Sequence, residues 1–87
     1  MHASVVHANI RDRDEAVRGL DEQVLPMLKD APGFVAAYFV ALDDTHGIAI
    51  QVFDTEAQAR AVAPPEGTDG PGVTVKTQQI GEVIGAA

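Results

Sequence analysis

The sequence predicts an α+β fold in which an antiparallel sheet is covered on one face by two helices. Four segments have the β-branched and aromatic residues of strands, two have the apolar spacing of helices, and their order is strand, helix, strand, strand, helix, strand. The chain has 87 residues, which is enough for one domain and no more. We therefore expect a single domain over residues 1–87.

The first strand is predicted over Ala3–Ile10, where β-branched residues alternate with small or polar ones. The period then changes to that of a helix. Asp12 and Glu15 have the spacing of a capping box, and apolar residues recur at helical spacing after them. These signals predict a helix over Arg13–Lys29, with Pro26 kinking or tightening its last turn.

The second strand is predicted over Gly33–Leu42, which is apolar throughout and is therefore expected to be buried on both faces. The turn cluster DDTHG follows, in which Gly47 suits the positive φ of a hairpin loop. Ile48–Phe53 is expected to return antiparallel to the second strand.

A second helix is predicted over Thr55–Ala63, with Asp54 as its cap and with Ala57 and Ala61 buried against the sheet. A glycine-rich connector then leads to the last strand, Val73–Ile80. This order of elements is that of the ferredoxin-like split βαβ fold, βαββαβ.

A second copy of the chain is expected against the open face of the sheet. Two helices cover one face only, while the second strand is apolar on both. An isolated copy would leave one face of this strand in water. The exposed residues would be either Phe34, Tyr38, Val40 and Leu42 or the residues that alternate with them. Packing two sheets face to face buries that surface under two-fold symmetry, so we expect a homodimer.

Strand parity predicts which side chains share a face. The helix-facing set is expected to be Ile48, Ile50, Val52, Val6, Ala8 and Ile10. The opposite face is expected to carry His7, Asn9, Gln51, Phe53, Thr74, Lys76 and Gln78. The polar members of this second set either line a cleft against the partner or are solvated at its rim.

Charge and hydropathy exclude several partners. Lys and Arg number 6 against 13 Asp and Glu, and the net charge of −7 repels phosphate backbones and anionic membrane surfaces. We therefore expect no nucleic-acid and no membrane partner. No apolar run has the length of a spanning helix, and the first residues lack a signal-peptide pattern, so a cytoplasmic protein is expected.

Three stretches of the chain carry a resemblance to a known family. They are PGF at Pro32–Phe34, the acidic-glycine hairpin DDTHG, and Phe53–Ala57, where an aromatic residue leads into an acidic cap and an alanine-rich helix. Together they resemble the antibiotic-biosynthesis-monooxygenase-like (ABM-like) family of dimeric α+β barrels, over nearly the whole chain. The resemblance implies a ferredoxin-like fold that pairs through its sheet.

The resemblance also implies two kinds of chemistry. Enzymes of this family oxidise polycyclic phenols with O₂ and without metal or flavin, in the cleft between helices and sheet or in the barrel interior. A related branch binds and degrades haem, and Asn9 stands where that branch keeps an Asn. The family usually has Trp where this chain has Phe53, and the haem-degrading branch has a His on the second helix; this chain has neither, so no cofactor is expected.

A cofactor-free oxygenation needs a base, donors for the developing anion and a dry pocket. The resemblance makes His7 the candidate base, Asn9 and Gln51 the candidates to orient the substrate oxygen, and Tyr38 and Phe53 the candidates to flank its ring. Each residue has an ordinary alternative. His7 can be a half-exposed strand residue, Asn9 can end the strand by bonding to its own backbone, Gln51 can bond across the dimer, and both aromatic residues can be core.

No metal site is expected, because His2 and His7 are five residues apart and fall on opposite faces of a strand. Three functions remain: an oxygenase acting on an aromatic or polyketide-like molecule, a non-catalytic dimer that binds a small ligand, and a structural dimer with a filled interior. A ring-sized pocket that holds His7 and Asn9 favours the first. A pocket without His7 favours the second.

Overall fold

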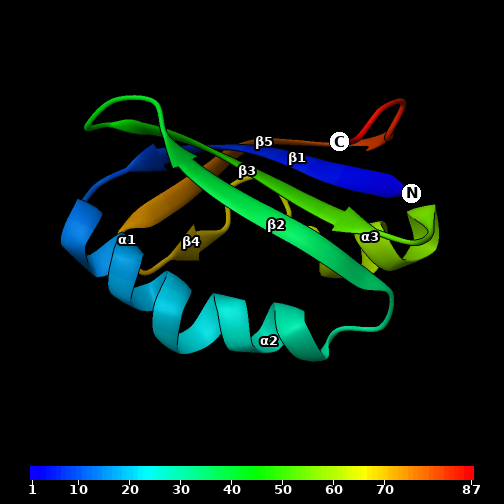
Figure 1. Cartoon of the computed structure of the whole chain (residues 1–87). Helices are drawn as coiled ribbons and strands as arrows, with labels where there is room; N and C mark the ends of the chain where they lie inside the picture. The colour runs from blue at the N-terminus through cyan, green and yellow to red at the C-terminus, as the bar shows by residue number, and fades with distance from the viewer.

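The computed structural model describes all 87 residues and has an α+β fold. Five antiparallel strands form one curled sheet in the order β2-β3-β1-β5-β4, and the helices lie together beneath one of its faces (Figure 1). The strands are β1 His2–Ile10, β2 Phe34–Ala41, β3 His46–Phe53, β4 Asp69–Gly70 and β5 Val73–Glu82. The helical segments are α1 Arg13–Gly19, η1 Leu20–Val24, α2 Leu25–Asp30 and α3 Glu56–Val62. The arrangement is compatible with the predicted ferredoxin-like fold.

The first helix contains one π-helical turn, η1. Asp12 caps the helix as predicted, because its carboxylate accepts a hydrogen bond from the Glu15 N–H at 3.0 Å. Further along, the Leu25 N–H donates to the carbonyl of Leu20, five residues back. Pro26 follows directly; in an uninterrupted α-helix its ring would crowd the carbonyl four residues before it. The wider π turn accommodates the proline without a break in the helix.

The second helix begins one residue later than predicted. Thr55, not Asp54, is the cap: its hydroxyl accepts from the Gln58 N–H at 3.2 Å, and the Gln58 side chain accepts from the Thr55 N–H at 3.2 Å. This reciprocal capping box satisfies two backbone donors. A cap at Asp54 would satisfy at most one, because Ala57, three residues on, has no polar side chain to return the hydrogen bond.

The hairpin between β2 and β3 is closed by Asp43. Its Oδ1 atom accepts from the backbone N–H groups of Thr45 and His46, each at 2.8 Å, and the His46 ring nitrogen lies 3.0 Å from it. The Thr45 backbone N–H, followed by the His46 ring, lowers the pKa of Asp43 to about 2. Gly47 does not have the positive φ expected of it, because these hydrogen bonds close the loop without one.

Cross-strand pairs show that the predicted parity of β3 is wrong. Directly opposite residues of antiparallel strands lie on the same face, and Ser4 is opposite Gln51 while Val6 is opposite Ala49. The odd-numbered residues of β3 therefore face the helices. The helix-facing set includes Gln51, Phe53 and Gln78, which were expected on the other face, and the set that faces away includes Ile48, Ile50 and Val52.

The packed core lies at one end of the layer between sheet and helices. Leu28, Phe53 and Ala59 are fully buried there, and α3 packs against β1, β3 and β5. Ala57 and Ala61 were expected to face the sheet, but both are exposed, because the register of α3 set by its cap turns Ala59 inward instead.

Candidate functional site

An apolar cavity of about 410 Å³ lies between the sheet and the first helix. Its floor includes Ala8, Gly47 and Ala49 from β1 and β3, and its roof includes Val17 and Leu20 from α1 and η1. The volume is in the range of about 300–1,000 Å³ that small-molecule pockets occupy. Small side chains on the floor leave this space unfilled.

The loop between α3 and β5 closes one side of the cavity. Gly70 and Pro71 line it, and the backbone N–H groups of Arg11 and Asp12 hold the loop by donating to the Gly72 carbonyl at 2.7 and 3.2 Å. Gly72 has a φ of +69°, and a Cβ there would lie 2.3 Å from the Asp12 carbonyl oxygen. The close approach of loop and helix therefore requires a glycine.

The Arg11 side chain fastens the same loop to β5. Its Nη1 atom donates to Asp69 Oδ1 at 2.9 Å, to the Val73 carbonyl at 3.0 Å and to the Thr74 hydroxyl, and its Nη2 atom donates to the Gly70 carbonyl at 3.0 Å. The Thr74 hydroxyl, together with the Arg11 charge, lowers the pKa of Asp69. Arg11 and Asp69 are 58 residues apart, so no local pattern in the sequence indicates this cluster.

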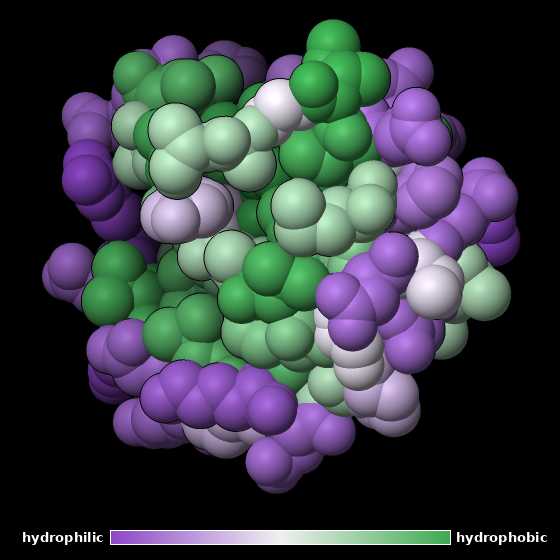
Figure 2. Space-filling view, turned by 45° about the vertical axis from the view of Figure 1, so that its right-hand side comes forward, coloured by the Kyte–Doolittle hydropathy of each residue, from purple (hydrophilic) through white to green (hydrophobic).

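The mouth of the cavity runs between the first helix and the edge strand β2. Exposed lining residues on the helix-facing side mark it: Arg13 and Val17 from α1, Met27 from α2, and Ala41, which lies opposite Gly47. Figure 2 shows a broad apolar area on this side of the molecule, framed by hydrophilic residues. Arg13 is the one charged residue in the lining, and its guanidinium lies 3.6 Å from the Asp44 carboxylate.

Gln51 is the polar group of the inner cavity. It is only 5% exposed, and the fully buried Ser4 hydroxyl donates to its Oε1 atom at 3.1 Å. The Gln51 Nε2 atom makes no hydrogen bond within the chain. It is not fully enclosed, because the only enclosed side-chain nitrogen or oxygen that lacks a hydrogen-bond partner is His2 Nδ1. Gln51 Nε2 is therefore accessible, and Gln51 lines the cavity.

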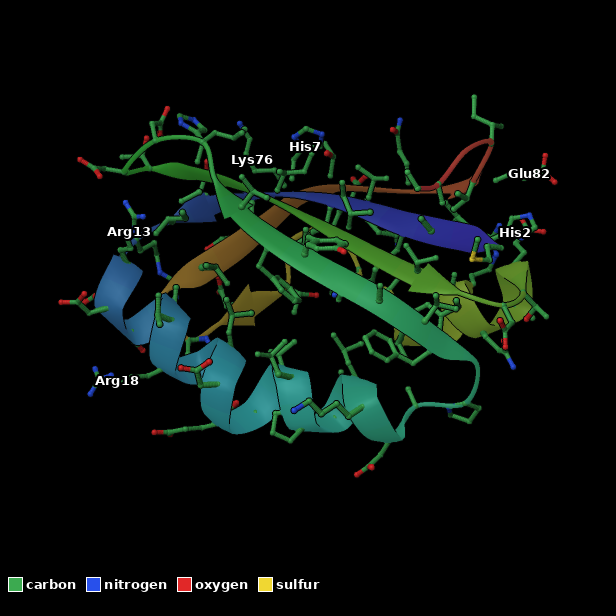
Figure 3. All side chains as sticks on the ribbon, viewed as in Figure 1. His2, His7, Arg13, Arg18, Lys76 and Glu82 are labelled. Carbon is green, nitrogen blue, oxygen red and sulfur yellow. The ribbon has the colours of Figure 1, made fainter.

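The predicted site residues do not come together. Gln51 lines the cavity, and Phe53 lies in the adjacent core, edge to face with Phe34 at a ring-centroid distance of 5.8 Å. His7, Asn9 and Tyr38 lie on the opposite, uncovered face of the sheet. Figure 3 shows His7 pointing away from the helices. The sheet itself thus separates two groups that the parity prediction had joined.

The two residues directly opposite His7 in the sheet are uncharged. These cross-strand neighbours are Ile48 and Thr77, and no carboxylate lies opposite His7 to orient the ring as a base. No group of three or more His, Asp or Glu side chains is placed to hold a metal ion.

Sequence reasoning missed Ser4. It has the parity of Val6 and Ala8 on β1, so it is a polar residue on a face expected to be apolar. A buried hydroxyl needs a partner, and that need was the available signal for a polar residue on the neighbouring strand.

Comparison with known proteins adds no family. No protein-family model, curated protein or solved structure matches this chain. None of the helices has the length and apolar character required to cross a membrane.

Proposed function

We propose that the protein binds a small, largely apolar molecule in the cavity between the sheet and the first helix. The observation that carries this proposal is the cavity itself, about 410 Å³ with a mostly hydrophobic lining. A small domain depends on every packed contact for stability, and an open volume gives up the dispersion contacts that filling it would supply. A binding role explains why the chain leaves this space open.

The position of His7 favours binding over catalysis. His7 lies on the far side of the sheet from the cavity, and the cavity lining contains no His, Asp, Glu or Lys. A molecule held in the cavity therefore meets no side-chain base.

The proposal includes a homodimer of the dimeric α+β barrel type, in the cytoplasm, formed by the uncovered faces of two sheets. Tyr38 is 64% exposed, Val40 47% and Leu42 61%, and no helix lies over them. The strands β1, β2 and β3 contain no acidic residue, although the chain has 13. Two copies, each with a net charge of −7, can thus meet on this face without opposing carboxylates.

A monooxygenase acting on an aromatic or polyketide-like molecule is the second candidate, and Gln51 is the observation that favours it. An amide donor in a mostly apolar cavity stabilises the anion of a phenolic substrate. In this candidate Gln51 holds the substrate oxygen and Phe53 closes the inner end. His7, Asn9 and Tyr38 take part only in a reaction between the sheets of two copies.

Binding is tested by titrating the protein with the fluorescent ketone 6-propionyl-2-(dimethylamino)naphthalene. We expect saturable binding that Ala49→Leu weakens at least about tenfold, because the added side chain fills the cavity floor. Ala57→Leu, on the exposed face of α3, is the matched control and should bind as the native chain does. A native protein that does not bind the dye saturably would overturn the proposal.

Two further measurements address the dimer and the second candidate. Sedimentation should find two copies per particle in the native protein and one in Tyr38→Asp, which places a charge in the paired faces. Oxygen uptake with hydroquinones and anthrones, lost in Gln51→Met or in His7→Ala, would support the oxygenase. No uptake with any of these compounds would leave binding as the sole function.

A further inference from the structure

We infer that the molecule held in the cavity carries a neutral carbonyl oxygen, that Gln51 Nε2 donates to this oxygen, and that Ser4 is the positioning residue that directs the amide toward it. The inference rests on the proposed function and specifies the ligand.

The donor is identified by burial and by its lack of a partner. Gln51 is 95% buried, since its exposed fraction is 5%, and its Nε2 atom has no acceptor within the chain. The atom itself stays accessible, so its N–H groups are free to donate to a ligand. Residues around it in the cavity are mostly hydrophobic, so the acceptor has to come from the ligand or from water that the ligand displaces.

Ser4 decides which end of the amide the ligand meets. The hydroxyl is fully buried and donates to Gln51 Oε1 at 3.1 Å. With its oxygen occupied in this way, the amide presents its NH₂ group to the cavity. An accepting group such as a ketone or quinone oxygen fits this end, whereas a ligand N–H group does not.

The charge distribution requires the accepting group to be neutral. Arg13 is the only charged lining residue, and it lies at the mouth, 60% exposed and next to Asp44. A carboxylate beside Gln51 would therefore lose its hydration without a nearby cation. The ligand is oriented with its carbonyl at the inner end and its apolar body over Ala8 and Ala49.

The experiment compares two dyes that differ in one group. 6-Propionyl-2-(dimethylamino)naphthalene has the carbonyl, and 6-propyl-2-(dimethylamino)naphthalene lacks it. Gln51→Met removes the donor with little change in side-chain size, and Gln79→Met makes the same change opposite Val5 on the uncovered face. We expect Gln51→Met to weaken the carbonyl dye about tenfold, the effect of one buried hydrogen bond, and to change the carbonyl-free dye less than about twofold. Gln79→Met should change neither.

Emission of the bound carbonyl dye gives a second measurement that does not depend on the Gln51 variant. A hydrogen bond to the carbonyl shifts the emission to longer wavelength, so the native complex should emit to the red of the same dye in dry hydrocarbon. Ser4→Ala should reduce this shift, because the amide is no longer held in one orientation, while the carbonyl-free dye still binds. An unshifted emission in the native complex overturns the inference even if Gln51→Met fails to fold.

The two proposals fail in different ways. If neither dye binds the native protein, the binding function itself is wrong. If both dyes bind the native protein and Gln51→Met equally well, the cavity binds ligands but the assigned hydrogen bond does not exist.

Discussion

The layer between sheet and helices is filled at one end and hollow at the other. At the packed end Leu28, Phe53 and Ala59 have no exposed surface. At the hollow end Val17 and Met27 are about half exposed, although they belong to the apolar side of the first helix. The fold is thus held together mainly by one end, which leaves the other end free to take a ligand.

Side-chain size on the sheet explains the difference. The packed end has the rings of Phe34 and Phe53, which reach the helices. The hollow end has Ala8, Gly47 and Ala49, which do not. The loop that contains Gly72 also holds the start of the first helix in place at the hollow end, because the Gly72 carbonyl accepts hydrogen bonds from Arg11 and Asp12.

The largest effect on the free energy of unfolding is expected at the packed end. Phe53→Ala should lower the free energy of unfolding by about 3–5 kcal/mol, because a fully buried ring is removed. Met27→Ala, at the half-exposed mouth, should lower it by less than about 1 kcal/mol. Urea unfolding at one protein concentration measures both. Equal losses would show that the two ends contribute alike.

Filling the hollow end should stabilise the protein. Ala49→Leu is expected to raise the free energy of unfolding by up to about 2 kcal/mol, because the side chain gains contacts in the existing space. Urea unfolding of this variant beside Ala57→Leu measures the gain. A loss of stability would mean that the hollow end has no room for the added atoms.

Substitutions at the two helix caps should distinguish the packed end from the hollow end by their effect on dye binding. Asp12→Ala and Thr55→Ala should each cost about 1 kcal/mol in unfolding experiments, since each removes one capping side chain. Only Asp12→Ala should also weaken dye binding, because α1 roofs the cavity whereas α3 covers the core. Identical dye affinities in the two variants would contradict this division.

The smallest effect is expected at the exposed hairpin near the cavity mouth. The pKa of Asp43 is lowered from 3.8 to about 2, so the stability that its hydrogen bonds supply is complete above about pH 4 and is lost as the pH falls toward 2. Asp43→Asn should remove this part of the acid dependence between pH 4 and 2. Unfolding curves across that range measure it, and an unchanged slope would exclude Asp43 as its source.

Much of the fold could be predicted because its local signals agree. The strands and helices follow from periodicity, and the cap at Asp12 follows from its spacing to Glu15. The prediction for β3 was wrong because it assigned the more apolar set, Ile48, Ile50 and Val52, to the helices, whereas this set faces away from them. Pairing with Ser4 accounts for Gln51 facing inward, and Leu28 accounts for Phe53 doing so.

The candidate site was harder to predict than the fold. A cavity depends on which large side chains are absent. The sequence does not indicate that the space over Ala8 and Ala49 stays empty. The incorrect parity prediction for β3 also put Gln51 on the same face as His7, although the two side chains lie on opposite faces of the sheet. Once Gln51 is moved to the helix side, its buried amide becomes the principal polar feature of the site.

The π turn sets the angular phase between the two halves of the first helix. Each residue of an α-helix advances the chain by about 100°, as 3.6 residues make a turn. The π turn holds one residue more than an α-helical turn, so deleting one residue within Leu20–Val24 would restore a regular α-helix and keep Leu28 directed at Phe53. A deletion at Arg18, within the regular α1, would instead rotate the cavity-lining Val17 by about 100° relative to the core residue Leu28.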